Sequence, residues 1–289
     1  MVDVTVQDGN AGMQRTEVVD GIRMRWEERG EGLPLVLVHG IPTSPSLWRH
    51  VVPLVSKARC LAWEMVGYGG SIPEGRDRDI SVARQADYLL AWLQAIGIER
   101  AVLAGHDLGG GVVQIVAVRQ PGVCAGLFLT NAIGYDSWPI PSVKAMRAMG
   151  ALLRHLPDPL FKHVLALFYR RGHDDPDRAA EALAVHWPFY ADADGAAAFI
   201  RQVRSLRVED TLAVADRLPE LRLPARIVWG ADDQFQKIRY GERLARDLAA
   251  PLQRIDRGKH FTPEDHPEIV ARDLNQLLEA VREQAHEQR

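Results

Sequence analysis

The segment "AGHDLGGG", residues 104–111, places an aspartate in a turn crowded with glycine. It follows the apolar run "RAVL" and precedes "VVQIVAV", a pattern that predicts a strand, a tight turn and a helix. A turn of this kind carries a nucleophile when it reads Gly-x-Ser-x-Gly. Gly105 and Gly109 fit that spacing, with the Asp107 carboxylate where the serine would stand. The turn alone leaves two interpretations open, a carboxylate nucleophile or an aspartate that caps the following helix.

Three further segments at the ends of apolar runs offer complementary groups. "VHGIP" (38–42) offers backbone amides, "WGADD" (229–233) offers a carboxylate, and "RGKHF" (257–261) offers a histidine. The carboxyl ends of parallel strands gather at one edge of an open sheet, where such sheets bind ligands. We therefore expect Asp107, an acid from "WGADD" and His260 to meet at one site.

The elements that must position these groups alternate along the chain. Strands are predicted at six apolar runs: 33–40, 59–67, 100–107, 124–132, 225–233 and 252–258. Helices are predicted by helical spacing at five segments: 44–57, 81–98, 108–122, 240–250 and 267–284. A hairpin is predicted over 16–30, around Asp20-Gly21. This alternation predicts an α/β fold, a mostly parallel sheet with helices on both faces.

The alternation is interrupted between residues 134 and 216. This segment has helical patterns, several prolines and aromatic clusters, but no convincing strand. The sequence therefore predicts a helical cap inserted into the sheet domain, dividing the chain into 1–133, 134–216 and 217–289.

Composition excludes several classes of function. The chain has 289 residues, is 47% hydrophobic and 25% charged, and carries a formal net charge of −3. It has no basic stripe for nucleic acid, no apolar run of the roughly 18 residues that cross a bilayer, and no signal-peptide pattern. Cys60 and Cys124 lie in apolar runs, which predicts buried free thiols. We expect a cytoplasmic protein with no nucleic-acid or membrane partner.

Four segments carry a resemblance to a known family. They are "HGIPTSPSLWR", "GHDLGG", "WGADD" and "HFTPEDHP". They resemble the α/β-hydrolases, and within them the branch of haloalkane dehalogenases and epoxide hydrolases, whose nucleophile is an aspartate. The likeness covers roughly 20–133 and 217–285 and is weak across the cap. It implies the α/β-hydrolase fold, with no cofactor and no metal.

The resemblance assigns a role to each matched residue. Asp107 matches the nucleophile, His260 the base, and Asp233 the acid of W-G-x-x-D. The same spacing favours Asp233 over its neighbour Asp232. The backbone amides of the oxyanion hole come from the two positions matched here by Ile41 and Leu108.

A carboxylate nucleophile selects the chemistry. Its pKa, ordinarily near about 3.9, leaves it anionic at neutral pH, so it needs no base before it attacks. Attack on an ester carbonyl would give an anhydride that readily reverts, whereas attack on a saturated carbon with a leaving group gives a stable alkyl ester. We therefore expect a small apolar substrate such as an alkyl halide or an epoxide. His260 would then activate the water that hydrolyses the ester, and Asp233 would orient the imidazole.

The sequence departs from its relatives at the leaving group. Leu108 and Ile41 stand where a halide-binding tryptophan and asparagine are usual, and neither side chain donates a hydrogen bond. The stretch 197–207 also lacks the second tyrosine of an epoxide hydrolase. We expect at least one donor from the cap to point into the pocket, from Tyr135, Trp138, His186, Trp187 and Tyr190. The alternative is that these side chains only pack the cap onto the core.

Three functions stay open on the sequence. A dehalogenase-like hydrolase is favoured, because "HGIPTSPSLWR" and "HFTPEDHP" are closest to that group. Epoxide hydrolysis to vicinal diols is the nearest alternative, because the usual halide ligands are missing. A non-catalytic ligand-binding or receptor protein on the same fold is the third, and the complete Asp–His–Asp set argues against it. The natural substrate and the oligomeric state stay open as well.

Overall fold

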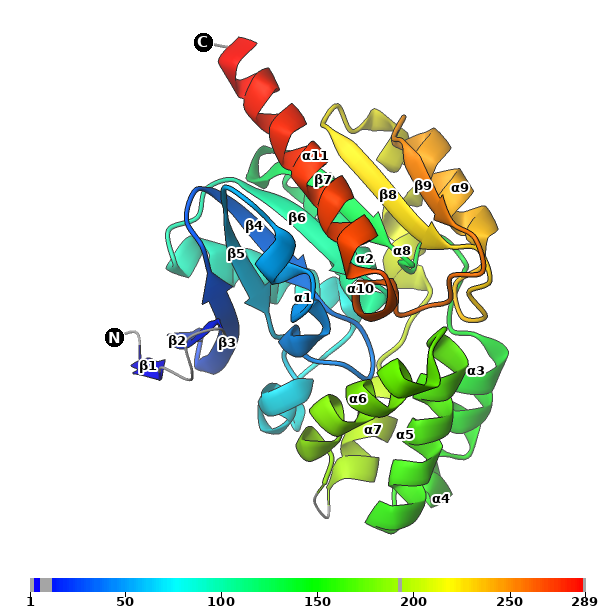
Figure 1. Cartoon of the computed structure of the whole chain (residues 1–289). Helices are drawn as coiled ribbons and strands as arrows, with labels where there is room; N and C mark the ends of the chain where they lie inside the picture. The colour runs from blue at the N-terminus through cyan, green and yellow to red at the C-terminus, as the bar shows by residue number, and fades with distance from the viewer. Residues whose placement is uncertain (1–2, 6–11, 192–193, 288–289) are drawn as a thin grey trace.

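A mixed β-sheet forms the centre of the computed structural model, which describes residues 3–5, 12–191 and 194–287. Within these residues the strand order is β1-β2-β3-β5-β4-β6-β7-β8-β9 (Figure 1). The strands are β1 (Asp3–Thr5), β2 (Met13–Val19), β3 (Ile22–Arg29), β4 (Leu33–Val38), β5 (Ala58–Trp63), β6 (Ala101–His106), β7 (Cys124–Thr130), β8 (Ala225–Gly230) and β9 (Leu252–Ile255). Neighbours from β5 onward in that order pair in parallel, whereas the pairs from β1 to β5 are antiparallel.

Helices cover both faces of this sheet. On one face, α2 (Leu108–Arg119) packs on β4, β6 and β7, with α1 (Val82–Ala95) beside it. On the other face, α11 (Pro267–Glu287) packs on β7 and β8 and crosses in front of the sheet in Figure 1. Near the edge of the sheet, α9 (Ile238–Asp247) packs on β8 and β9. A mostly parallel sheet between two helical layers is the architecture that the alternating pattern predicted.

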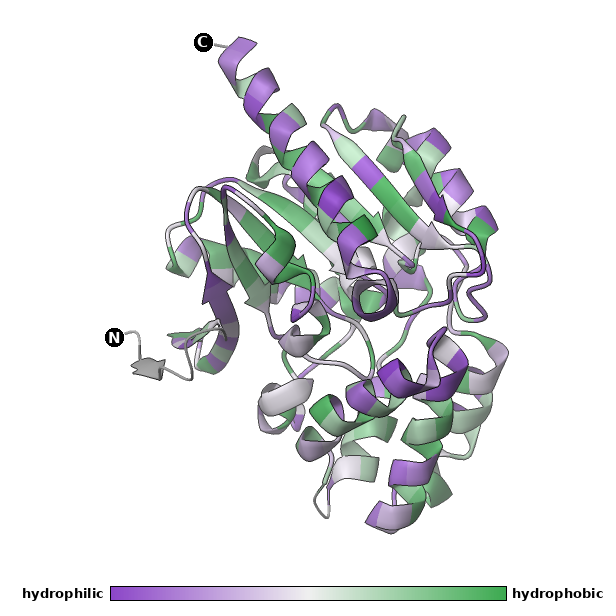
Figure 2. Cartoon of the chain, viewed as in Figure 1, coloured by the Kyte–Doolittle hydropathy of each residue, from purple (hydrophilic) through white to green (hydrophobic). Residues whose placement is uncertain are grey.

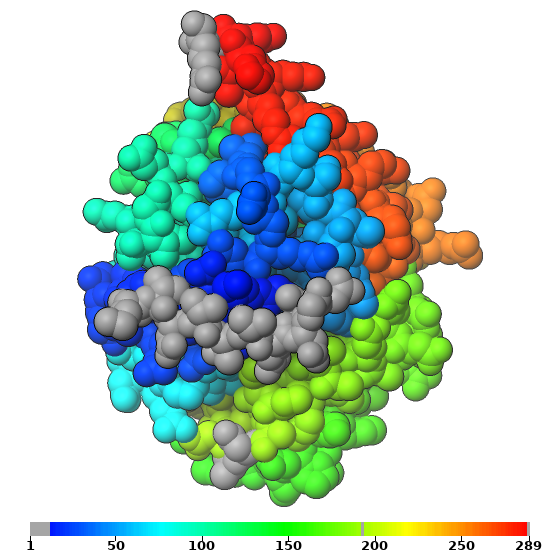
Figure 3. Space-filling view, turned by 60° about the vertical axis from the view of Figure 1, so that its left-hand side comes forward, coloured from blue at the N-terminus to red at the C-terminus, as the bar shows by residue number. Residues whose placement is uncertain are grey.

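The segment between β7 and β8 contains helices and no strand in its described residues. Its helices are α3 (Pro141–Ala148), α4 (Gly150–Leu153), α5 (Asp158–Gly172), α6 (Pro176–His186), α7 (Gly195–Arg204) and α8 (Glu209–Ala215). The first five gather in a lobe beside the sheet domain (Figure 1), and this green and lime lobe lies against the core in Figure 3. By contrast, α8 packs on α1 and α2. The division at 1–133, 134–216 and 217–289 stays a prediction.

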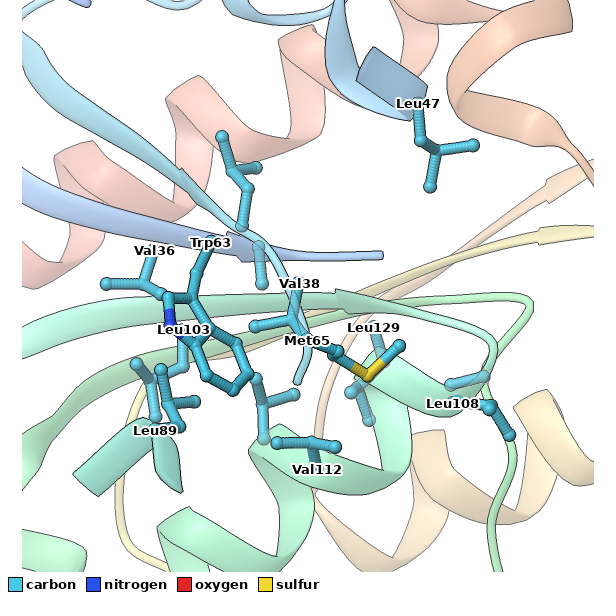
Figure 4. Close-up of a cluster of buried hydrophobic side chains, with 14 of the residues drawn as sticks. Val36, Val38, Leu47, Trp63, Met65, Leu89, Leu103, Leu108, Val112 and Leu129 are labelled. Atoms are coloured by element: carbon cyan, nitrogen blue, oxygen red, sulfur yellow. The ribbon is translucent and has the colours of Figure 1, made fainter. Parts of the chain in front are cut away.

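Burial explains why the central strands could be predicted. Every residue of β6 and β7 is buried, as expected of parallel strands that are covered on both faces. These strands are the green centre of the molecule in Figure 2, whereas the outer side of α11 is largely purple. Figure 4 shows Trp63 and Leu103 from the sheet packed beside Leu89 of α1, with Val112 of α2 nearby. This packing fixes the strand ends on which the site is built.

The helix predicted over 44–57 is wrong. The chain forms two short 3₁₀ helices there instead, Pro45–Trp48 and Val52–Leu54. In an α-helix, Pro53 would have no N–H for the carbonyl of Arg49, and its ring would clash with that carbonyl. The apolar spacing of this segment is real, and it places Leu47, Trp48 and Val51 in the core.

Candidate active site

The turn between β6 and α2 has the tight geometry that its glycines predicted. Asp107 adopts φ +49° and ψ −119°, a conformation that non-glycine residues rarely adopt. A Cβ on Gly105 would lie 2.4 Å from the carbonyl oxygen of Gly109, and a Cβ on Gly109 would lie 2.2 Å from that of Val38. The motif therefore needs glycine at both positions. The Asp107 side chain makes no capping hydrogen bond to α2, so the helix-cap interpretation is not supported.

The Asp107 carboxylate is buried, and its two oxygens differ. Its side-chain Oδ2 accepts a hydrogen bond of 3.0 Å from the Ile41 amide, whereas Oδ1 lies 3.9 Å from His260 Nε2, beyond hydrogen-bond distance. Burial raises the pKa of the Asp107 carboxyl, while His260 and the amides of Ile41 and Leu108 partly offset that rise. One oxygen is thus held by the backbone, and the other is left without a hydrogen bond.

Gly40 allows the Ile41 amide to approach so closely. A Cβ on Gly40 would lie 2.5 Å from Asp107 Oδ2, so any larger residue would push the carboxylate away. The same loop is tied to the helical insertion, because the Tyr169 hydroxyl of α5 donates to the Pro42 carbonyl at 2.9 Å. Of the two matched oxyanion-hole positions, Ile41 thus directs its amide at Asp107 Oδ2, and the Leu108 amide helps to lower the pKa of the Asp107 carboxyl.

His260 follows β9 and lies between the two predicted carboxylates. Its Nδ1 is hydrogen-bonded to Asp233 Oδ2 at 2.8 Å, and its Nε2 faces Asp107. Burial lowers the pKa of His260, but the charges of Asp233 and Asp107 outweigh burial and leave that pKa raised. The end of α5 supports this loop, since the Gly172 carbonyl accepts the His260 amide at 2.9 Å.

Asp233 is the acid that contacts His260, and its exposed neighbour Asp232 makes no hydrogen bond to the imidazole. Asp233 Oδ1 accepts hydrogen bonds from the backbone amides of Phe235 and Gln236, at 2.6 and 3.0 Å. Four donors therefore converge on Asp233, because Asn131 Nδ2 also donates to Oδ2 at 2.6 Å. A carboxylate that accepts this many hydrogen bonds is held in one position.

Asn131 is a site residue that the sequence reasoning missed. It directly follows β7, and its Oδ1 accepts from the Gly230 amide at 3.2 Å and the Thr262 hydroxyl at 3.1 Å. With its bond to Asp233, Asn131 joins the ends of β7 and β8 to the loop that carries His260. Its place at a strand end was a usable signal, because the same rule found Asp107 and Asp233.

A small apolar cavity opens beside these groups, with a volume of about 40 Å³. Its polar lining comes from Asp107, His260 and Gln236. The remaining lining residues are Ile41, Leu108, Ile133, Trp138, Pro139, Ile140, Val143, Phe168, Leu206 and Phe235. Ligand pockets have this character, an apolar wall with few polar groups. A space of this size suits a substrate of a few heavy atoms.

Two of the five cap candidates lie near the first turn after β7. Trp138 lines the cavity, but its indole Nε1 donates to Thr211 Oγ1 at 2.7 Å. The Tyr135 hydroxyl donates to Asp247 Oδ2 at 2.6 Å, and Tyr135 is not among the residues that line the cavity. The Trp138 indole thus bonds within the insertion, and the Tyr135 hydroxyl joins the insertion to the core.

The other three candidates do not line the cavity either. The Tyr190 hydroxyl donates to Gln202 Oε1 at 2.9 Å, and His186 Nδ1 is 3.0 Å from Ser44 Oγ. Trp187 packs beside Phe161, with Lys162 over its ring. In this structure, therefore, none of the five candidates brings an unused donor to the cavity, and the packing alternative describes their contacts better.

Three further features of the chain are its cysteines, its capacity to hold a metal ion and its capacity to span a membrane. Cys60 and Cys124 are buried free thiols, as predicted. Among the described residues, no group of three or more His, Cys, Asp or Glu side chains is arranged to hold a metal ion. In the same part of the chain, no helix combines the length and the apolar character needed to span a membrane.

The strand ends described above fall within a segment that matches a known protein family. Residues 34–267 match the model of the alpha/beta hydrolase fold. The chain belongs to the α/β-hydrolase fold family. The match extends from β4 to the start of α11, and so includes the turns that carry Asp107, Asp233 and His260. The fold implied by the sequence resemblance is confirmed.

Two curated relatives of this α/β-hydrolase differ in how much of the chain they match. YugF of Bacillus subtilis (strain 168), an uncharacterized hydrolase, is 23% identical over 269 residues, or 91% of this chain and 97% of that protein. Bifunctional epoxide hydrolase 2 of Rattus norvegicus is 34% identical over 106 residues, or 36% of this chain and 19% of that protein. The second match thus spans about a fifth of its relative. Family and relatives together support hydrolase activity.

Solved structures resemble the whole chain. An α/β-hydrolase fold protein from Burkholderia ambifaria has a TM-score of 0.84 and 29% identity, covering 90% of this chain and 96% of its own. The epoxide hydrolase CorEH has a TM-score of 0.76 at 21% identity, covering 97% and 100%. The ancestral haloalkane dehalogenase AncHLD2 also has a TM-score of 0.76, at 24% identity, covering 93% and 99%. The last two likenesses show the shared fold alone.

Proposed function

We propose that this α/β-hydrolase forms an alkyl ester on Asp107 and hydrolyses it with water that His260 activates. One observation carries the proposal. The Asp107 carboxylate faces an apolar cavity with Oδ2 held by the Ile41 amide and with Oδ1 opposite His260 Nε2. A buried carboxylate with one uncommitted oxygen beside a histidine suits nucleophilic attack followed by general-base catalysis.

In the first half-reaction, Asp107 Oδ1 attacks a saturated carbon of the substrate. A carbon–oxygen bond forms, the bond from that carbon to the leaving group breaks, and the leaving group takes the electron pair. The Ile41 and Leu108 amides favour the anionic carboxylate against the burial that raises its pKa. The apolar wall excludes water that would otherwise solvate the attacking oxygen.

In the second half-reaction, His260 Nε2 takes a proton from water, and the hydroxide adds to the carbonyl carbon of the ester. Negative charge then develops on Oδ2, which the Ile41 amide already contacts in the resting state. When the intermediate collapses, the alcohol leaves and takes the proton from His260. Asp233 holds the imidazole in orientation and stabilises its cation. Because the pKa of His260 is raised, this step should speed up as pH rises through that pKa.

An alkyl halide is the first substrate class that we propose. The cavity is small and apolar, and its lining contains no tyrosine among the described residues. A halide leaves as an anion without a proton, whereas an epoxide oxygen becomes an alkoxide that needs one. Epoxide hydrolysis is the second candidate, favoured by the partial match to an epoxide hydrolase. The placement of Asp107 and His260 at the cavity, with Asp233 bonded to His260, argues against a purely ligand-binding protein.

The variant His260→Gln tests the covalent step. It should be alkylated by a substrate and then fail to release the product, so intact-protein mass spectrometry should detect a stable adduct on the peptide that contains Asp107. His260→Gln combined with Asp107→Ala is the matched control and should form no adduct. A panel of haloalkanes and epoxides, scored separately for halide and diol, assigns the substrate class. Normal turnover by His260→Gln, with no adduct on any substrate, would exclude this mechanism.

A further inference from the structure

The leaving group is the part of the proposed reaction that still lacks a protein partner. Charge grows on a departing halide in the transition state, and a donor aimed at that position typically contributes several kcal/mol. Leu108 and Ile41 have no side-chain donor, and the Trp138 N–H is bonded to Thr211. Apart from Asp107 and His260, the polar residue that lines the cavity is Gln236.

The Gln236 side chain is buried and incompletely bonded. Its exposed fraction is 3%, and its carboxamide Oε1 has no hydrogen-bond partner in the described part of the chain. A buried amide group without a partner is unfavourable by about 1–3 kcal/mol. An unpartnered oxygen at the wall of a cavity can be completed by a donor, and the carboxamide meets an acceptor there only when its NH₂ group faces the cavity.

The Gln236 backbone, in contrast, is held at both ends. Its N–H donates to Asp233 Oδ1 at 3.0 Å, and its carbonyl accepts from the Trp229 indole at 2.9 Å. The carboxamide therefore extends from a rigid base that is shared with the acid of the triad. With no protein bond to fix Oε1, half a turn about the last side-chain bond exchanges oxygen and NH₂ at the cavity wall.

We propose that the Gln236 carboxamide donates through Nε2 to the leaving halide and so determines the substrate class of this site. The inference rests on the proposed alkyl-ester mechanism. A carboxamide stabilises an anion by hydrogen bonding but has no proton to release at neutral pH. The site is therefore suited to carbon–halogen bonds, and an epoxide oxygen finds no acid at this wall.

The test measures both half-reactions in single turnover, with propyl chloride, bromide and iodide as probes. Gln236→Met has similar length but no N–H. It should slow alkylation by propyl chloride by tenfold or more, about 1.4 kcal/mol, and slow alkylation by the iodide least, because iodide is the best leaving group. Ester hydrolysis should be unchanged, since the backbone bonds to Asp233 and Trp229 stay. Gln234→Met, an exposed change two residues away, is the matched control and should alter neither step.

The outcomes separate this inference from the mechanism on which it rests. If Gln236→Met, folded by circular dichroism, alkylates with propyl chloride at the wild-type rate, Gln236 is not the donor. If it slows both half-reactions equally for all three halides, Gln236 acts by supporting the Asp233 loop, and the proposal is overturned. If the wild-type protein forms no adduct with any propyl halide and releases diol from epoxides, the proposed dehalogenase function fails as well.

Discussion

In the described part of the chain, two buried clusters combine acids with histidines, and they differ in whether the histidine and acid themselves line a cavity. The first is the cluster of Asp107, His260 and Asp233 that we propose to be catalytic. In the second cluster, Glu264 Oε2 is 3.0 Å from His173 Nε2, and Glu264 Oε1 bonds Arg49 and lies 3.6 Å from His186 Nε2. His186 Nδ1 in turn lies 3.0 Å from Ser44 Oγ, so Ser44, His186 and Glu264 place a hydroxyl, an imidazole and a carboxylate in a row. The first cluster has a carboxylate in place of that hydroxyl.

The two clusters differ in access and in unpaired atoms. Asp107 and His260 line the cavity, and no hydrogen bond to Asp107 Oδ1 is formed by the described residues, with His260 Nε2 3.9 Å away. Ser44, His186 and Glu264 are buried and do not line that cavity. Residue types and their order are therefore insufficient for catalysis, because a reacting atom must also be free and reachable by substrate.

The electrostatics of the two clusters also diverge. Burial raises the pKa of the Asp107 carboxyl. Burial would do the same at Glu264, but His173, His186 and the Arg49 charge hold the pKa of that carboxyl well below its usual range. The pKa of His186 is lowered by burial, whereas that of His260 is raised. The second cluster thus stabilises a fixed charge between the insertion and the core, whereas the proposed mechanism requires the groups of the first cluster to react.

The largest expected effect separates the clusters by activity. Asp107→Ala should reduce turnover by about 10⁴-fold or more, as removal of a nucleophile does in other hydrolases. Ser44→Ala should stay within about threefold of the wild-type rate, because Ser44 reaches no substrate. Steady-state rates on the best haloalkane or epoxide measure both. A Ser44→Ala variant as inactive as Asp107→Ala would place the chemistry in the wrong cluster.

The second prediction separates the clusters by stability. Glu264→Gln removes the buried charge that faces Arg49, and breaking such a pair typically lowers the free energy of unfolding by about 3–5 kcal/mol. The matched control is Glu268→Gln, an exposed position at the start of α11, which should change that free energy by less than about 0.5 kcal/mol. Urea unfolding followed by circular dichroism gives both values. Equal losses in the two variants would show that the Glu264 network adds no stability.

The third prediction concerns the pH dependence of the same network. The folded pKa of Glu264 lies below its usual value of 4.5, so the ionised group contributes stability above that pH, and the contribution is lost as pH falls below it. The wild-type free energy of unfolding should therefore decline more steeply than that of Glu264→Gln between about pH 6 and about pH 3. Parallel pH curves for the two proteins would contradict the ion-pair account.

The smallest effects on the alkylation rate are expected when the hydroxyls of two tyrosines in the insertion are removed. Tyr135→Phe and Tyr190→Phe remove hydroxyls that bond Asp247 and Gln202 outside the cavity lining. Each should change the alkylation rate by less than tenfold, about 1.4 kcal/mol. Single-turnover rates with propyl bromide measure this. A larger loss of alkylation rate in either variant would show that a cap tyrosine activates the leaving group, as expected from the sequence.

Local sterics and strand order made much of the site predictable. Asp107, Asp233 and His260 were found because each follows a predicted strand, and Gly105 and Gly109 because only glycine fits the turn between them. The helix predicted over 44–57 is wrong for a local reason too, because Pro53 prevents the α-helix that the apolar spacing favours. Strand ends, glycine turns and prolines each depend on a few neighbouring residues, so they can be identified from the sequence alone.

Taken alone, the sequence determined the fold family and predicted that Asp107, His260 and Asp233 lie together at the strand ends. Only the tertiary structure decided which of the remaining polar groups face the cavity. Tyr135 bonds a residue 112 positions away, and Ser44 bonds one 142 positions away, so neither pairing is visible along the chain. Whether a donor is free to bind a ligand depends on every group that packing brings within about 3 Å of it. That is why Gln236, without a motif, borders the cavity while four of the five cap candidates do not.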